Sequence, residues 1–494
     1  MSLDPSAAAR SGESLIVDTP HGRLRGTVFD GIRQFKGVPY AAAPIGPLRF
    51  RPPQPLAPWT GLREALSFAP AAPQPADRGF YPGDPDAMPA VLMSEDCLYL
   101  NIWSPAGAGP HPVLVWLHGG GQAVGGTSRP VYDGTAFARA GIACVTIGHR
   151  LGLLGFLEGG RIFGEEFRGS GNNALRDILA ALAWVRQTIA VFGGDPGRVT
   201  IGGESAGAKN VAALLAAPGA AGLFHAAFSS SGGGDTVHSL QTADAVAERT
   251  LALAGSARAL RELPAVGLIA LQERLSRSET RRHPFRAVAD GIFLPQAPRL
   301  LPCHPMPLLI GTARDEAAPF LIEMPQGDGD SAEDWAGRLL AHLEPDIMAQ
   351  AEKRAVQLWP GMSAGARRLK LLTAEAYELP SIRLADAHRV SGNPTWFYRN
   401  DRPLVAGPFA GWAPHVADLG LIWNRPGPYG TVADPGNGGM HEMITTFVHA
   451  AGAAAWPPYD IGKRATLVFD VDGAELRADL SADIRLIFDG LFER

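Results

Sequence analysis

A serine between two glycines is the residue of this chain whose surroundings best fit covalent chemistry. Gly203 and Gly207 flank Ser205, which lies between a β-branched run at 199–201 and an alanine- and leucine-rich run at 206–215. This pattern predicts a strand, a tight turn and a helix, with Ser205 at the turn. Small residues are needed on both sides because larger side chains would collide with the returning backbone. We therefore expect Ser205 to be a nucleophile, with an ordinary turn as the alternative in a chain of 59 glycines.

Three consecutive glycines have a use in the same reaction. The apolar run 113–118 predicts a buried parallel strand and leads directly into Gly119, Gly120 and Gly121. Attack on an ester places negative charge on the carbonyl oxygen, and glycines let backbone N–H groups approach that oxygen. The run is therefore a candidate oxyanion hole, with a flexible loop as the alternative.

A serine nucleophile also needs a base and an acid from elsewhere in the chain. Asp315 and Glu316 follow a predicted strand at 307–311, and His415 lies in a loop after a predicted strand at 395–398. Either acid could be the partner of the base. The residue type alone does not select His415, because eight further histidines follow Ser205: His225, His238, His283, His304, His342, His388, His441 and His449.

The elements that would position these residues alternate between strand and helix. Predicted strands at 113–118, 142–147 and 199–201 are interrupted by a predicted helix at 172–192, an order typical of a parallel sheet. Segments at about 232–306 and 317–394 look mostly helical, and residues 465–470 look like the last strand. We expect one α/β domain over residues 12–494, with a central, mostly parallel sheet flanked by helices and two large helical excursions.

Composition excludes several other classes of protein. A net charge of -5, with 46% apolar and 19% charged residues, describes an ordinary globular protein without the basic surface that nucleic-acid binding needs. Cys97, Cys144 and Cys303 are widely spaced, which favours neither a disulfide framework nor a cysteine-built zinc site. Residues 1–14 contain no apolar core of signal-peptide length, and no apolar run elsewhere is long enough to span a bilayer. We expect a cytoplasmic protein with no membrane partner.

Six motifs in the same order resemble the type-B carboxylesterases, the cholinesterase-like α/β-hydrolases. They are Gly37-Val38-Pro39-Tyr40, Leu48-Arg49-Phe50, Glu95-Asp96-Cys97-Leu98-Tyr99-Leu100-Asn101, His118-Gly119-Gly120-Gly121, Phe192-Gly193-Gly194-Asp195-Pro196 and Gly203-Glu204-Ser205-Ala206-Gly207. The resemblance extends to residues 456–459. The chain looks most like the bacterial members of para-nitrobenzyl-esterase type, because it has no long C-terminal tail or leader.

The resemblance implies an α/β-hydrolase fold and a serine carboxylesterase that acts on small-molecule esters through an acyl-enzyme. It implies no metal and no cofactor, and a monomer or homodimer. Carried over to this sequence, it makes Ser205 the nucleophile, Glu316 the acid and His415 the base, and it assigns the oxyanion hole to the N–H groups of Gly120, Gly121 and Ala206.

Further positions of the resemblance concern the support of the site. Glu204 matches a buried glutamate that steadies the site through hydrogen bonds. Two pairs match structural ion pairs of the family, namely Arg49 with Glu95 and Arg150 with Asp177.

Departures from the family pattern bear on the substrate. Gln122 follows the glycine run where an aromatic residue is common, and Lys209-Asn210 stands where small residues or serine are usual. His149 replaces the usual tyrosine. A lysine in a first helical turn is unfavourable with the helix dipole unless it is paired. These departures hint at a polar or acidic group on the substrate.

We expect a deep, largely apolar pocket. Gln122 and Trp412 are expected at this pocket, with Phe320 and Phe409 as further wall residues.

Two rival functions remain open. The same three side chains also serve acyl transfer to an alcohol or amine, or the hydrolysis of amides or thioesters. A non-catalytic binding module of the same fold is the less favoured alternative, because Ser205, Glu316 and His415 are all present.

Overall fold

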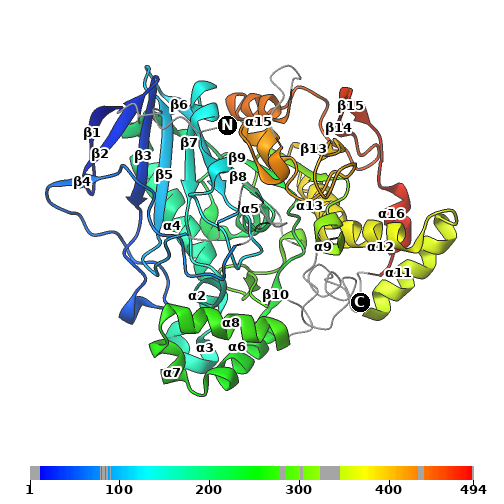
Figure 1. The fold of residues 1–494 in the computed structure, drawn as a ribbon, viewed down its shortest axis with the longest axis horizontal. Coiled ribbons are helices and arrows are strands. Elements are labelled where there is room, and N and C mark those ends of the chain that lie inside the picture. Colours follow the sequence, from blue (N-terminus) through cyan, green and yellow to red (C-terminus); the bar gives the residue numbers. More distant parts are fainter. Residues whose placement is uncertain are drawn as a thin grey trace, which may run out of the picture.

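A computed structural model describes residues 12–77, 79, 84, 87–88, 91–278, 284–300, 304–322, 345–431 and 439–491. Within this part of the chain, thirteen strands form one sheet in the order β1-β2-β3-β5-β7-β6-β8-β9-β12-β13-β14-β15, with β4 paired to β2 (Figure 1). The strands are β1 (Glu13–Thr19), β2 (Gly22–Phe29), β3 (Ile32–Pro39), β4 (Leu62–Glu64), β5 (Tyr99–Pro105), β6 (His111–Leu117), β7 (Ala143–Ile147), β8 (Gly194–Glu204), β9 (Ala226–Ser230), β12 (Leu308–Ala313), β13 (Thr395–Asn400), β14 (Thr466–Asp470) and β15 (Gly473–Arg477).

The middle of the sheet is parallel. Neighbouring strands from β7 through β6, β8, β9, β12 and β13 to β14 all run in the same direction. The pairs toward both edges are antiparallel, except that the short β4 runs parallel to β2. The carboxyl ends of parallel strands meet at one edge, which is where open α/β sheets bind ligands. The predicted, mostly parallel central sheet is confirmed.

Strand β6 shows why the sheet is covered on both faces. Its side chains alternate between two apolar clusters: Val113, Val115 and Leu117 pack on one face, and Leu114 and Trp116 pack on the other. The first cluster includes apolar residues of helices α4 (Asn173–Thr188) and α5 (Ala206–Ala216). The second includes those of α1 (Thr135–Arg139), α14 (Leu419–Trp423) and α15 (Met440–His449).

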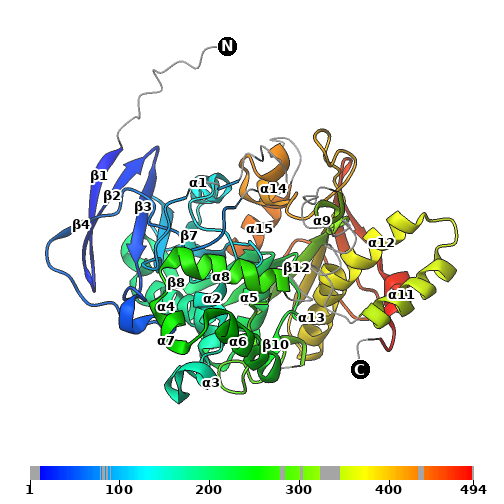
Figure 2. The same ribbon diagram turned by 60° about the horizontal axis from the view of Figure 1, so that its bottom comes forward.

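Two groups of helices extend from the sheet (Figures 1 and 2). The first contains α6 (Leu240–Ala254), α7 (Ala257–Glu262) and α8 (Ala265–Ser278), near α2 (Gly152–Phe156) and α3 (Gly160–Phe163). It also carries a small parallel pair, β10 (His238–Ser239) and β11 (Val288–Ala289). The second contains α9 (Ala318–Ile322), α11 (Pro345–Leu358), α12 (Ala364–Thr373), the π-helix η8 (Ala374–Glu378) and α13 (Leu379–Val390), beside α16 (Ala482–Phe488). Residues 279–283, 301–303 and 323–344 of the predicted excursions lie outside the described residues.

The C-terminal edge corrects one prediction. Residues 465–470 were expected to be the last strand, but β15 follows β14 and pairs with it antiparallel. All five residues of β15 are at least partly exposed. A strand at the edge of a sheet needs no alternation of buried residues, so its sequence lacks the apolar pattern that the prediction required.

The cysteines and the helices bear on two other expectations. Cys97 and Cys144 are buried thiols without a disulfide, and Cys303 lies outside the described residues. In the described part of the chain, no helix combines the length and the apolar character needed to cross a membrane.

Candidate active site

The turn that carries Ser205 is a sharp connection between β8 and α5. Ser205 has φ 54° and ψ −118°, and its N–H donates to the carbonyl oxygen of Ser230 at 2.9 Å. A Cβ atom at Gly203 would lie 2.6 Å from the backbone of Gly207, and one at Gly207 would lie 2.1 Å from the carbonyl oxygen of Leu117. The backbone of this turn therefore requires glycine on both sides of the serine.

Ser205, His415 and Glu316 meet in one line of contacts. Nε2 of His415 lies 2.9 Å from Oγ of Ser205, and Nδ1 lies 2.5 Å from Oε2 of Glu316. All three side chains are buried. They come from β8–α5, from the loop after β12 and from the loop after β13, so three neighbouring parts of the parallel sheet supply one site.

Glu316 is held on its other oxygen. Its Oε1 accepts hydrogen bonds from the hydroxyl of Ser231 at 2.6 Å and from the N–H of Ala313 at 2.7 Å. The neighbouring Asp315 faces a different way, since its Oδ2 accepts from the N–H of Ala413 at 2.9 Å and from the Arg314 guanidinium. Of the two acids left open by the sequence, Glu316 is the one that contacts His415.

The other histidines bond elsewhere. Nδ1 of His225 accepts from a backbone N–H, the rings of His238, His304, His441 and His449 lie within hydrogen-bond distance of backbone carbonyls, and that of His388 contacts Thr395. None of these six contacts Ser205, whereas His283 and His342 lie outside the described residues.

The glycine run lies beside the serine. Leu117 at the end of β6 is paired with Gly203, and the position of a Cβ atom on Gly119 would lie 3.3 Å from Cβ of Ser205. Gly120 and Gly121 have φ values of 112° and 62°, which glycine adopts without strain. Among the described residues, the N–H groups of Gly120, Gly121 and Ala206 donate to no acceptor.

A stacked pair of histidines lies under this run. The rings of His118 and His149 are parallel, with centroids 4.8 Å apart, and Nδ1 of His118 lies 2.8 Å from the carbonyl oxygen of Gly119. Burial, followed by the charge of His149, lowers the pKa of His118 to about 3, and burial also lowers the pKa of His149. Both rings are therefore neutral at pH 7, so they stack without charge repulsion.

Glu204 adds a second carboxylate beside His415. Its Oε1 lies 3.3 Å from Nε2 of His415 and makes no hydrogen bond with the described residues. Burial raises the pKa of Glu204 to about 8. Burial acts to lower the pKa of His415, but the charge and hydrogen bond of Glu316, together with the charge of Glu204, outweigh it and raise this pKa.

Two residues of the site were not predicted as site residues. The ring of Tyr377 packs on His415 with centroids 4.6 Å apart, and Asp418 accepts a hydrogen bond from Ser230 at 3.0 Å. Tyr377 lies in the π-helix η8, a distortion that is common at functional sites. Asp418 follows His415 by three residues, which was the available signal for it. Burial, followed by the charge of Glu316, raises the pKa of Asp418 to about 6.

The residues expected at the pocket lie in different places. Gln122 is turned toward α5, where its Nε2 donates to Oδ1 of Asn210 at 2.7 Å. The ring of Phe320 lies 5.8 Å from that of His415, and Trp412 is half-buried. Phe409 is fully buried against Tyr429, so it is part of the core and not of a pocket wall.

The ion pairs expected from the resemblance are both present. Arg150 donates to Asp177 from Nε at 2.8 Å and from a terminal nitrogen at 2.6 Å, and both residues are almost fully buried. Arg49 donates to Glu95 from Nε at 2.7 Å and also contacts it through a terminal nitrogen. Arg49 also donates to the carbonyl oxygens of Arg261 and Leu263 in the first excursion, and Arg150 donates to that of Arg51 in the N-terminal segment.

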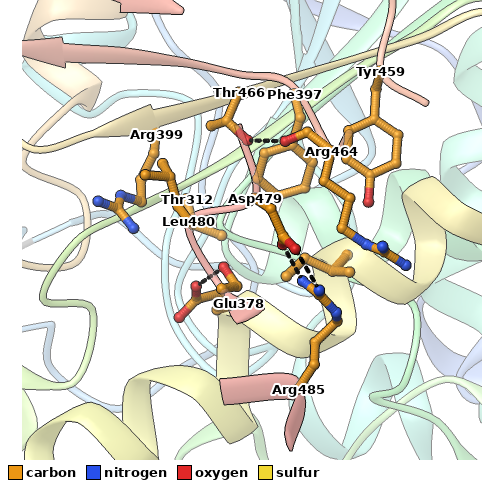
Figure 3. A pocket seen from close by; sticks show the side chains of 12 residues that line it. Thr312, Glu378, Phe397, Arg399, Tyr459, Arg464, Thr466, Asp479, Leu480 and Arg485 are labelled. Atoms are coloured by element: carbon orange, nitrogen blue, oxygen red, sulfur yellow. Dashed lines mark hydrogen bonds and ion pairs between the residues drawn. The ribbon is translucent and has the colours of Figure 1, made fainter. Parts of the chain in front are cut away.

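A cavity in the second half of the molecule is separate from this site (Figure 3). Arg485 pairs with Asp479 there, and Ser481 donates to Glu378. The lining residues are Thr312, Glu378, Ile382, Phe397, Arg399, Tyr459, Arg464, Thr466, Asp479, Leu480, Ser481 and Arg485. Ser205, His415 and Glu316 are not among them. The charged side chains that line the cavity pair with neighbouring side chains.

In the described ranges, no three histidine, cysteine or acidic side chains are grouped so that they could hold a metal ion.

Comparison with known proteins identifies the family. The sequence model of the Carboxylesterase family matches residues 13–449. The chain belongs to the carboxylesterase family. It is 33% identical over 479 residues to the para-nitrobenzyl esterase of Bacillus subtilis (strain 168), with 92% of this chain and 94% of that relative covered.

Solved structures agree with this assignment. A PNB esterase structure superposes with a TM-score of 0.80 at 30% identity, covering 97% of this chain and 99% of the other. The carboxylesterase EST55 of Geobacillus stearothermophilus gives a TM-score of 0.79 at 33% identity, covering 96% and 99%. The predictions of a carboxylesterase of para-nitrobenzyl-esterase type, of the α/β-hydrolase fold and of a carboxylic-ester hydrolase are confirmed.

Proposed function

We propose that this carboxylesterase hydrolyses its ester through an acyl-enzyme formed on Ser205. The observation that carries the proposal is the line of contacts from Oγ of Ser205 through His415 to Glu316, at 2.9 and 2.5 Å. A serine hydroxyl is a weak nucleophile until a base removes its proton. Nε2 of His415 takes that proton while Oγ forms a bond to the carbonyl carbon of the ester.

Glu316 prepares and stabilises the base. With its Oε2 beside Nδ1 of His415, it keeps the proton on Nδ1 and leaves the lone pair of Nε2 directed at Ser205. The carboxylate then stabilises the imidazolium that forms. Its hydrogen bonds from Ser231 and Ala313 fix its position during the reaction.

The N–H groups of Gly120, Gly121 and Ala206 receive the negative charge on the carbonyl oxygen. These N–H groups donate to none of the described residues, so they can bind the oxygen without first breaking a hydrogen bond. Donors arranged in advance stabilise the tetrahedral intermediate without reorganisation, and removing one such donor typically costs about a hundredfold in kcat.

The second half of the reaction repeats these steps with water. The tetrahedral intermediate collapses, the bond to the alcohol oxygen breaks, and Nε2 of His415 gives its proton to that oxygen. Water then attacks the acyl-enzyme as His415 takes one of its protons. The bond between the carbonyl carbon and Oγ of Ser205 then breaks as His415 returns its proton to Oγ. The carboxylic acid is released.

The test compares wild type, Ser205→Ala and Ser391→Ala on 4-nitrophenyl butyrate. Ser391 is an exposed serine on the far end of α13, which makes it a matched control. We expect Ser205→Ala to lose about a thousandfold or more in kcat and to lose the mass adduct of a fluorophosphonate, with Ser391→Ala unchanged.

Two outcomes would replace the proposal. A folded wild type that neither hydrolyses the ester nor forms the adduct would point to the non-catalytic binding module. A wild type that forms the adduct but gives a new ester or amide in preference to the free acid, when an alcohol or amine is added, would be an acyltransferase.

A further inference from the structure

Lys209 stands where a lysine is unfavourable. It is the fourth residue of α5, in the first turn, where the positive end of the helix dipole disfavours a cation. Its side chain is half-buried, so part of its hydration is also lost. In the part of the chain that the structure describes, its ammonium forms no hydrogen bond or ion pair with a carboxylate; its contact is the ring of Tyr377, 5.3 Å from Nζ to the centroid.

The helix directs this lysine toward the reacting serine. The N–H of Lys209 donates to the carbonyl oxygen of Ser205 at 3.0 Å, one helical turn away. Side chains on a helix lean toward its N-terminus, so Lys209 leans over the turn that carries Ser205.

Tyr377 fixes the direction of the ammonium. Its ring contacts Lys209 and also packs on His415, with centroids 4.6 Å apart. A single aromatic ring therefore separates the ammonium from the imidazole that contacts Ser205.

Tyr377 brings a second donor to the same place. The residue is 4% exposed, and its hydroxyl makes no hydrogen bond with any residue that the structure describes. Burial, with the charges of Glu316 and Glu204, raises the pKa of Tyr377, so its hydroxyl keeps its proton and remains a donor. An ammonium and a phenolic O–H are two donors that suit a carboxylate.

We propose that Lys209 and the hydroxyl of Tyr377 bind a carboxylate carried by the substrate, so that this carboxylesterase prefers esters with an anionic group. The proposal rests on the hydrolysis proposed above. The charges of Glu204, Glu375 and Glu316 act on Lys209 without forming an ion pair with it, so the bound carboxylate supplies the direct ion pair, and the ester bond of the same molecule then reaches Ser205. Lys209 thereby determines specificity, and it takes no part in the proton transfers.

The experiment uses two pairs of esters that differ in charge and little in shape. The first pair, 4-carboxyphenyl acetate and 4-methylphenyl acetate, places the charge on the alcohol part. The second, monomethyl adipate and methyl 6-methylheptanoate, places it on the acyl part. The kcat/KM of each ester is measured for wild type, Lys209→Met, Tyr377→Phe and the control Lys463→Met, an exposed lysine in the loop before β14.

We expect wild type to prefer the charged ester of at least one pair. Lys209→Met should reduce that preference about tenfold, while kcat/KM for the neutral ester changes less than about threefold. Tyr377→Phe should reduce the preference by a smaller factor, and Lys463→Met should leave it unchanged.

The preference should also depend on pH. Burial, followed by the charge of Arg286, lowers the pKa of Lys209 to about 8, while Glu204, Glu375 and Glu316 act in the opposite direction. The ratio of charged to neutral ester should therefore fall as the pH rises through 8 in wild type, and should not do so in Lys209→Met.

The proposal is wrong if Lys209→Met changes both members of each pair equally. In that case Lys209 only offsets the buried carboxylates around His415. A wild type that hydrolyses no ester of either pair and forms no fluorophosphonate adduct would instead reject the proposed function itself, so the two failures are distinguishable.

Discussion

Nε2 of Gln122 donates a hydrogen bond to Oδ1 of Asn210 at 2.7 Å, which ties the loop after the glycine run to helix α5. Gln122 has φ 64°, and its backbone carbonyl accepts from the N–H of Gly152. Two departures from the family pattern therefore satisfy each other. The amide of Gln122 is directed at the protein, and not at the substrate as the sequence suggested.

This pairing predicts a coupled effect on stability. Asn210→Ala leaves Nε2 of Gln122 with only the long contact of 3.4 Å to the carbonyl oxygen of Ala206, which should lower the free energy of unfolding by about 1–3 kcal/mol. Gln122→Leu in the same chain removes this poorly bonded amide and should recover part of the loss. Urea unfolding of both single variants and the double variant measures the coupling, and effects that simply add would show that the hydrogen bond contributes nothing.

We predict that removing the charge of Glu316 lowers kcat much more than removing the charge of the adjacent Asp315. Glu316→Gln removes the charge beside Nδ1 of His415 and should reduce kcat about a thousandfold or more. Asp315→Asn keeps an acceptor for the N–H of Ala413 and should stay within about tenfold of wild type. Steady-state kinetics on 4-nitrophenyl butyrate measures both, and a larger loss for Asp315→Asn would contradict the assignment of the acid.

The raised pKa of His415 predicts the acid side of the pH profile. The base must be neutral, so kcat/KM should rise with pH through a midpoint above 6.5. Burial raises the pKa of Glu204 to about 8, so this carboxyl is largely protonated in the pH range just above 6.5, and Glu204→Gln should lower the midpoint by less than about half a pH unit. A fall of a full unit or more, measured on a neutral ester, would show that Glu204 is charged when His415 titrates.

The buried pair of Arg150 and Asp177 predicts a large loss of stability. Asp177→Asn leaves the guanidinium of Arg150 buried without its counter-charge, which should cost about 3–5 kcal/mol in the free energy of unfolding. Asp30→Asn breaks the ion pair with Arg139, whose side chains are both more than half exposed, and provides the matched control. Thermal denaturation compares the two variants, and equal shifts would contradict a structural role for the buried pair.

The strands and helices around Ser205 were predictable because their signals are local. An apolar strand, a glycine on each side of the serine and an alanine-rich helix follow one another within seventeen residues. The collision that excludes other residues at 203 lies within the same turn, whereas the one at 207 is with the carbonyl oxygen of Leu117. The edge strand β15 was missed because half-exposed strands lack this pattern.

The partners of Ser205 depend on contacts across the fold. Residue type does not distinguish His415 from the other histidines, and only the family resemblance selected it before β8, β12 and β13 placed its loop beside Ser205. Tyr377 and the Gln122–Asn210 pair were not predicted for the same reason, since each joins segments that are more than thirty residues apart.

The π-helix η8 has a consequence for insertions and deletions. A π-turn accommodates one more residue than an α-turn, so deleting one residue between Ala374 and Glu378 would leave a regular helix from α12 into α13. Because the π-turn absorbs the extra residue, the deletion would keep α12 and α13 in register and would change the directions of the side chains within 374–378. The helix would survive, but Tyr377 would leave His415 and Lys209. The length of this segment is therefore as much a part of the candidate site as the residues in it, and homologues one residue shorter here would share the fold and the contacts of Ser205, His415 and Glu316 without the proposed preference for anionic esters.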